Sequence, residues 1–213
     1  MFRRIQFSAA SAVLGVVVAI CPLLAAADEY DRPASFEMVV SAGAKTCLPG
    51  ASGSVRIFQD GSVQTMEVSV KGLAPNTDYD FFVIQVPKSP FGLAWYQGDI
   101  STDKKGNGHL RVVGIFSVET FTVATGSAPA PVVFQGPFPD ASLNPVFNPI
   151  QMYHLGLWFD SPLAAQGAGC PATVTPFNGE HNAGIQVLNT SNFADDHGPL
   201  RDVTASAPKP KRD

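Results

Sequence analysis

The chain has 213 residues, with 14 Lys or Arg and 18 Asp or Glu, which gives a formal net charge of -4 at pH 7. No Lys/Arg cluster occurs in the body of the chain, so the sequence lacks the electrostatic footprint of a nucleic-acid-binding protein, and we expect no nucleic-acid partner. The length suits one large domain.

The first 27 residues have the three parts of a secretory signal peptide. Arg3 and Arg4 precede an apolar run over residues 9–20, and three small alanines end at Ala27. We therefore expect cleavage near Ala27 and a secreted or periplasmic protein.

Two alternatives to cleavage are open. Residues 9–27 make 19 residues, which is close to the lower limit for a membrane anchor. Pro22 and the alanine-rich end favour cleavage instead. A lipoprotein anchored through Cys21 is the second alternative, although Ile20 stands where a lipobox has Gly or Ala. We expect no membrane span in the mature chain.

Short alternating segments predict β-strands along the rest of the chain. They lie at residues 36–40, 55–57, 66–70, 110–112, 121–123, 155–159 and 185–187. Residues 79–86 are apolar on both faces, which predicts a central strand covered on both sides. The turn cluster at 103–108 separates the runs 94–100 and 109–116, and this spacing predicts a hairpin.

Eight or nine short strands without helical periodicity predict an all-β fold. We expect a two-sheet antiparallel β-sandwich over residues 28–197, followed by a flexible C-terminal tail over residues 198–213.

The stretch VKGLAPNTDYDFFVIQV at residues 70–86 resembles the corner of fibronectin type III and related immunoglobulin-like domains, through Leu73, Pro75, Thr77 and Tyr79. It is also similar to secreted bacterial β-sandwich proteins without an assigned activity. The resemblance implies that Leu73 plugs the end of the core and that the Tyr79 hydroxyl bonds back to the corner backbone. The chain departs from fibronectin modules in its greater length and in having no Trp in the early strands. The resemblance supports the fold more than any function.

Two cysteines remain once Cys21 leaves with the signal. Cys47 and Cys170 form an even pair in a chain bound for an oxidising compartment, so we expect a disulfide between them. The alternative is two free thiols, one of them a metal ligand.

A long Pro-rich loop is expected at residues 126–151, because proline lacks the amide donor that an interior strand needs. Loops of this length are usually functional or disordered. Three aromatic residues that favour burial stand in it: Phe134, Phe138 and Phe147. The loop is interpreted either as a strap packed across the sandwich or as an apolar contact loop for a partner or ligand.

The motifs of familiar chemistries are missing from the sequence. A G-x-S-x-G nucleophile motif and a His-x-His pair do not occur. Cys170, His181 and Gln186 follow the order of blue-copper ligands, but Cys170 and His181 are too far apart. His154 is interpreted as a half-exposed strand residue beside Trp158. We expect no catalytic residues, no bound metal and no cofactor.

A polar turn lies within residues 175–190. Asn178-Gly179 is a turn dipeptide, and polar residues follow it directly. The turn is interpreted as structural, and the alternative is a small polar binding site. That site would combine His154, Glu180, His181 and Asn182.

The sequence therefore predicts an exported binding or envelope-associated structural module without recognisable catalytic apparatus. Its partner would be a protein, a glycan or a small ligand. One alternative is a metal-binding or redox protein that uses His154, Glu180, His181 and Cys170. Another is a hydrolase of unfamiliar type with a concave carboxylate pair.

Overall fold

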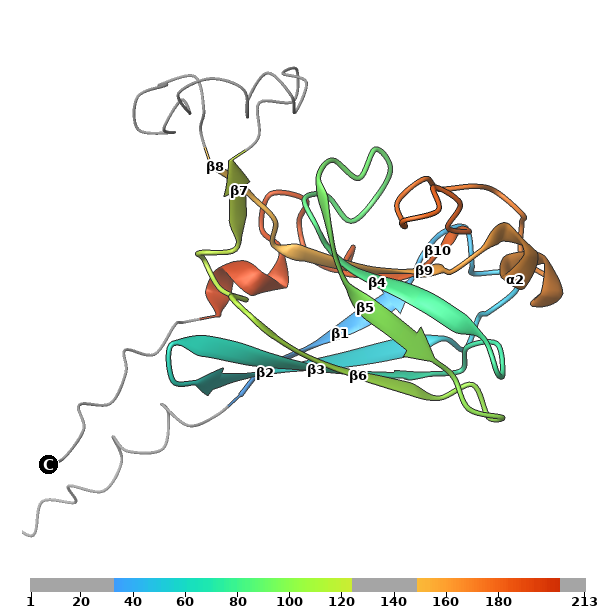
Figure 1. Cartoon of the computed structure of the whole chain (residues 1–213), viewed down its shortest axis with the longest axis horizontal. Helices are drawn as coiled ribbons and strands as arrows, with labels where there is room; N and C mark the ends of the chain where they lie inside the picture. The colour runs from blue at the N-terminus through green and yellow to red at the C-terminus, as the bar shows by residue number, and fades with distance from the viewer. Residues whose placement is uncertain (1–32, 124–148, 204–213) are drawn as a thin grey trace, which may run out of the picture. The chain divides into compact units, whose positions relative to one another are not determined.

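A computed structural model describes residues 33–123 and 149–203. Antiparallel β-strands dominate this part of the chain (Figure 1). The strands are β1 (Ala34–Val40), β2 (Ser52–Asp60), β3 (Val63–Lys71), β4 (Asp78–Ile84), β5 (Ala94–Ser101), β6 (Gly108–Gly114), β7 (Phe121–Val123), β8 (Pro149–Gln151), β9 (His154–Phe159) and β10 (Gln186–Asn189). A short helix α2 (Pro162–Gly167) and a 3-10 helix η2 (Pro199–Asp202) complete the elements named below.

Eight of the strands form one antiparallel sheet in the order β5-β4-β9-β10-β1-β2-β3-β6. Strand β1 belongs to both halves, because residues 34–38 pair with β2 and residues 39–40 pair with β10. The sheet is nearly barrel-like, and Figure 1 shows β2, β3 and β6 lying opposite β4 and β9. The all-β, antiparallel prediction is confirmed at this level.

The alternation in the sequence becomes the inside and outside of this sheet. Inward side chains form the main core, among them Val55, Ile57, Met66, Val68, Phe81, Leu155 and Leu157. On β4 the opposite face is buried too, because Phe82 and Ile84 pack with Trp158 in a second cluster. The prediction of a central strand covered on both sides is therefore confirmed for β4.

The corner before β4 has the expected contacts. Leu73 is buried in the main core. The backbone N–H of Ala74 donates to the buried Tyr79 hydroxyl over 2.9 Å. Burial raises the pKa of Tyr79, so the hydroxyl stays neutral and holds the corner.

The predicted hairpin between residues 94–100 and 109–116 is wrong. Strand β5 pairs with β4, and β6 pairs with β3, so the two strands belong to different halves of the sheet. The connection between them is bonded to the corner instead. The Leu73 N–H donates to the Gly106 carbonyl over 3.1 Å, and the Thr102 N–H donates to the Thr77 carbonyl over 3.0 Å. These bonds hold the connection between β5 and β6 against the corner where the chain crosses from one layer to the other.

The loop and tail predictions need correction at their edges. Residues 149–151, expected in the Pro-rich loop, form β8 and pair with β7. The expected tail is wrong for its first residues, because η2 is ordered and Leu200 lies in the core. Leu200 is apolar, and its burial extends the domain to Val203.

Several predictions fall outside the described residues. They concern the signal peptide and the three loop residues Phe134, Phe138 and Phe147. Within the described ranges, no helix has the length and apolar character needed to cross a membrane.

The predicted disulfide is confirmed. Cys47 and Cys170 are joined by an S–S bond of 2.01 Å, with their Cα atoms 5.3 Å apart. Cys170 follows α2, so the bond ties the segment after β9 to the segment after β1. Cys170 is therefore not the free thiolate that a metal or redox site would need.

Candidate functional site

His154 is the first residue of β9, and its ring is buried and hydrogen-bonded at both nitrogens. Its side chain is only 1 % exposed. Nε2 lies 3.1 Å from the Ala194 carbonyl and 3.2 Å from the Asp195 carbonyl, and Nδ1 lies 2.9 Å from Thr190 Oγ1. Because carbonyl groups only accept, these partners fit a neutral ring that donates from Nε2 and accepts at Nδ1. Burial lowers the pKa of His154, which also favours the neutral form. The half-exposed placement expected from the sequence is wrong.

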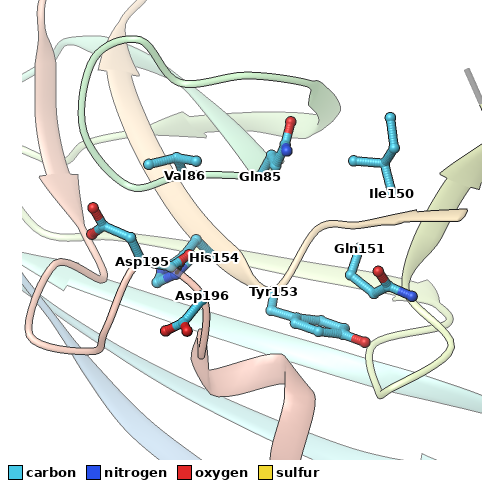
Figure 2. A pocket seen from close by; sticks show the side chains of 8 residues that line it. All are labelled: Gln85, Val86, Ile150, Gln151, Tyr153, His154, Asp195 and Asp196. Carbon is cyan, nitrogen blue, oxygen red and sulfur yellow. Dashed lines mark hydrogen bonds between the residues drawn. The ribbon is translucent and has the colours of Figure 1, made fainter. Parts of the chain in front are cut away.

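A pocket of about 430 Å³ lies beside His154 (Figure 2). Residues from four segments line it: Gln85 and Val86 after β4, Ile150 and Gln151 of β8, Tyr153 and His154, and Asp195 and Asp196 after β10. Figure 2 shows Gln85 and Val86 on one loop and the two aspartates on another, with Tyr153 between them and β8.

Some of the polar groups in this pocket are already engaged. The Tyr153 hydroxyl donates to the Val118 carbonyl over 3.0 Å, and Lys88 Nζ lies 3.1 Å from Asp195 Oδ1. By contrast, no hydrogen bond within the described ranges joins the side chain of Gln151 or Asp196 to another residue. Among the described residues of the lining, these two polar side chains are the ones without a side-chain hydrogen bond.

The polar turn at residues 178–182 is held by hydrogen bonds of the Asn178 side chain. The Asn178 side chain donates to the Asp160 carbonyl over 2.9 Å and accepts from the Asn182 N–H over 2.9 Å. His181 has φ 58°, a left-handed conformation that is uncommon outside glycine and asparagine. The side chains of Glu180 and His181 are exposed. These contacts match the structural interpretation of the turn.

The structure does not bring the four predicted polar residues into one site. The Gly184 N–H donates to the Phe159 carbonyl over 2.7 Å, which places the turn at the far end of β9 from His154. A six-residue strand separates the two by roughly 20 Å. Within the described residues, no group of three or more His, Cys, Asp or Glu side chains is arranged to hold a metal. The combination of His154 with His181 and Cys170 is therefore corrected.

Sequence reasoning missed a group of carboxylates at that far end of β9. Asp80 on β4 stands directly opposite Asp99 on β5 and opposite Trp158 on β9. Asp160 follows β9, and its N–H donates to the Asp78 carbonyl over 3.2 Å. We call Asp80, Asp99 and Asp160 the Asp80 cluster.

Asp80 is the buried member of this cluster. Its side chain is 2 % exposed, and its Oδ2 has no hydrogen-bond partner among the residues that the structure describes. Burial, followed by the charges of Asp160 and Asp99, raises the pKa of Asp80 from 3.8 to about 7, while the Asn178 side chain opposes the rise. Burial and neighbouring carboxylates also raise the pKa of Asp160. The cluster therefore holds a proton at a pH where isolated carboxylates have lost theirs.

Aromatic rings border the cluster. The Tyr96 hydroxyl donates to Asp99 Oδ1 over 2.6 Å, and its ring meets Phe82 edge to face at 5.5 Å. Trp158 packs against Phe82 and against Phe177 from the polar turn. Tyr96 is 46 % exposed, so the cluster has an aromatic rim open to solvent.

One sequence signal could have indicated this cluster. In YDFFVIQV, Asp80 is the single charged residue of a strand that is otherwise apolar on both faces. Its partners lie 19 and 80 residues further along the chain, by subtraction from Asp99 and Asp160. Only the pairing of β4 with β5 and β9 brings them together.

No protein-family model matches this sequence, and no curated protein matches it either.

Proposed function

We propose that the protein is an exported binding module of immunoglobulin-like β-sandwich type, and that its pocket beside His154 binds a small saccharide. The pocket with its unengaged polar side chains carries this proposal. The Cys47–Cys170 disulfide supports the exported location, because disulfides persist in oxidising compartments. The bond from Ala74 to Tyr79 supports the relation to immunoglobulin-like folds.

The size and lining of the pocket fit a small polyhydroxylated ligand. Its volume of about 430 Å³ falls within the range of roughly 300–1,000 Å³ for small-molecule sites. Gln151 can donate and accept, and Asp196 can accept, which is what vicinal hydroxyl groups require. Val86 and Ile150 supply apolar surface for the C–H groups of a sugar ring. Lys88 pairs with Asp195, so the carboxylate of Asp196 is the acidic group of the lining that can accept from sugar hydroxyls.

A binding titration with matched glutamine variants tests this function. The full mature protein is titrated with a panel of mono- and disaccharides by calorimetry, and Gln151→Ala is compared with Gln166→Ala. Gln166 is an exposed glutamine of α2, far from the pocket lining.

We expect Gln151→Ala to weaken saccharide binding about tenfold, the equivalent of one lost hydrogen bond near 1.4 kcal/mol. Gln166→Ala should bind as the wild type does. Absence of binding across the panel, or equal affinities for both variants, would overturn the proposed function.

A further inference from the structure

The Asp80 cluster has an excess of negative charge that no ion pair in the described part of the chain compensates. Within residues 33–123 and 149–203, the ion pairs are Lys88–Asp195 and His197–Asp202, and neither includes a member of the cluster. Asp80 Oδ2 is shielded from solvent and has no hydrogen-bond donor. A buried carboxylate oxygen without a donor is costly to the fold, and the Asn178 side chain offsets only part of the cost of burying Asp80.

The groups that face Asp80 come from every neighbouring element. Asp99 and Tyr96 belong to β5, Asp160 follows β9, and the amide side chain of Asn178 comes from the polar turn. Asp78 on β4 and the exposed Glu180 lie near Asp160. Each of these carboxylates is negative or neutral, so together they favour a cation at this surface.

We propose that the Asp80 cluster binds a primary ammonium group on an alkyl chain, as found in linear diamines and in Lys side chains. This site is separate from the saccharide pocket, because the pocket lies at the His154 end of β9. Asp99 and Asp160 are exposed and offer the direct contacts. Asp80 lies between them and gains a compensating charge.

The chemistry of the site favours ammonium over a metal ion. No three acidic or His side chains of the described part have the arrangement of a metal site. An ammonium group has three donors and no acceptor, so it can serve several carboxylates without a fixed coordination geometry. The exposed ring of Tyr96 borders the same surface and can pack against the alkyl chain or the cation.

Binding of a cation is coupled to the proton on Asp80. The pKa of Asp80 is about 7 in the free protein, so near that pH about half of the molecules hold this proton. A bound ammonium group stabilises the carboxylate and lowers that pKa. Binding therefore releases part of a proton at pH 7, and affinity falls as the pH drops below 7.

The experiment is calorimetric titration of the mature protein at pH 7 in two buffers of different ionisation enthalpy. The probes are 1,5-diaminopentane, a short peptide with an acetylated N-terminus and one unmodified Lys, and calcium chloride. The first two carry the proposed group and separate a free amine from a Lys side chain, while calcium tests the metal alternative. The variants are Asp99→Asn and Asp80→Asn, with Asp60→Asn as a control of equal charge change on the distant end of β2.

We expect the diamine, the peptide or both to bind with release of part of a proton. Asp99→Asn should weaken binding about tenfold, which corresponds to about 1.4 kcal/mol. Asp80→Asn should abolish proton release, and Asp60→Asn should match the wild type. Failure of both amines to bind, preferential binding of calcium, or unchanged proton release in Asp80→Asn would overturn the proposal.

Discussion

The buried polar side chains at the two ends of β9 differ in how completely they are hydrogen-bonded. At one end, His154 is buried and both ring nitrogens have partners. At the other end, Asp80 is equally buried, but its Oδ2 has no partner within the described ranges, and the carboxylates of Asp160 and Asp99 lie nearby. A buried polar group whose bonds are complete stabilises the fold, whereas one with an open bond is retained at a cost. From this comparison we infer a structural role for His154 and a ligand-binding role for Asp80.

The largest expected change in stability concerns the disulfide, which ties down the segment that follows the Asp80 end of β9. The bond spans 123 residues, so the loop-entropy model gives up to about 5 kcal/mol of stabilisation. We expect the double variant Cys47→Ala/Cys170→Ala to lose several kcal/mol in denaturant unfolding. A loss below about 1 kcal/mol would show that the carboxylate end is held by packing alone.

Replacing His154 should destabilise the fold, because its hydrogen bonds at this end of β9 are lost. We expect His154→Leu to lower the free energy of unfolding by about 3 kcal/mol, because the Thr190 hydroxyl and two carbonyls lose their partner. His109→Leu is the matched control, since His109 is exposed on β6. Equal unfolding free energies for the two variants would contradict a structural role for His154.

Removing the aspartate charge should have the opposite sign. We expect Asp80→Asn to raise the free energy of unfolding by about 2 kcal/mol at pH 8, because it removes an uncompensated buried charge. At pH 4 the carboxyl is already protonated in the fold, so the gain should vanish. Asp60→Asn, at the exposed end of β2, should change little at either pH. A destabilised Asp80→Asn at pH 8 would break the comparison.

The two ends should also respond oppositely to pH. The pKa of Asp80 is raised to about 7 in the fold, so its contribution to stability is present below about pH 4 and is lost as the pH rises through 7. The pKa of His154 is lowered in the fold, so its contribution is present above pH 6.5 and is lost as the pH falls. Urea unfolding from pH 4 to 8 should show stability rising with pH more steeply in Asp80→Asn than in the wild type. Identical pH profiles would contradict the raised pKa of Asp80.

The smallest expected effect is at the rim of the cluster. Tyr96→Phe removes the donor to Asp99, and we expect a change in unfolding free energy of only about 0.5 kcal/mol because the pair is exposed. Amine binding should weaken less than in Asp99→Asn. A loss as large as that of Asp99→Asn would assign the main contact to Tyr96 instead.

The sequence predicted what depends on neighbours along the chain. Alternation located the strands, and the corner around Tyr79 was expected with its hydroxyl bond. The cysteine pair followed from number and compartment. These predictions depend on the alternation of apolar residues, on one short motif and on the number of cysteines.

What the sequence could not predict depends on strand pairing. The pairing of β1 with both β2 and β10 turns two layers into one nearly barrel-like sheet. The connection over residues 102–107 bonds to the corner, so the expected hairpin does not form. The same lack of pairing information placed His154 beside the polar turn and concealed the Asp80 cluster, whose members meet only through the register of β4.

An NMR titration of the Asp80 side-chain carboxyl, with and without 1,5-diaminopentane, compares the pKa of this buried group with that of an ordinary carboxyl group. We predict a pKa of about 7 in the free protein and a lower pKa when the diamine is bound. A carboxyl that titrates near the usual 3.8, or one whose pKa the diamine leaves unchanged, would contradict the assignment of ligand binding to this end.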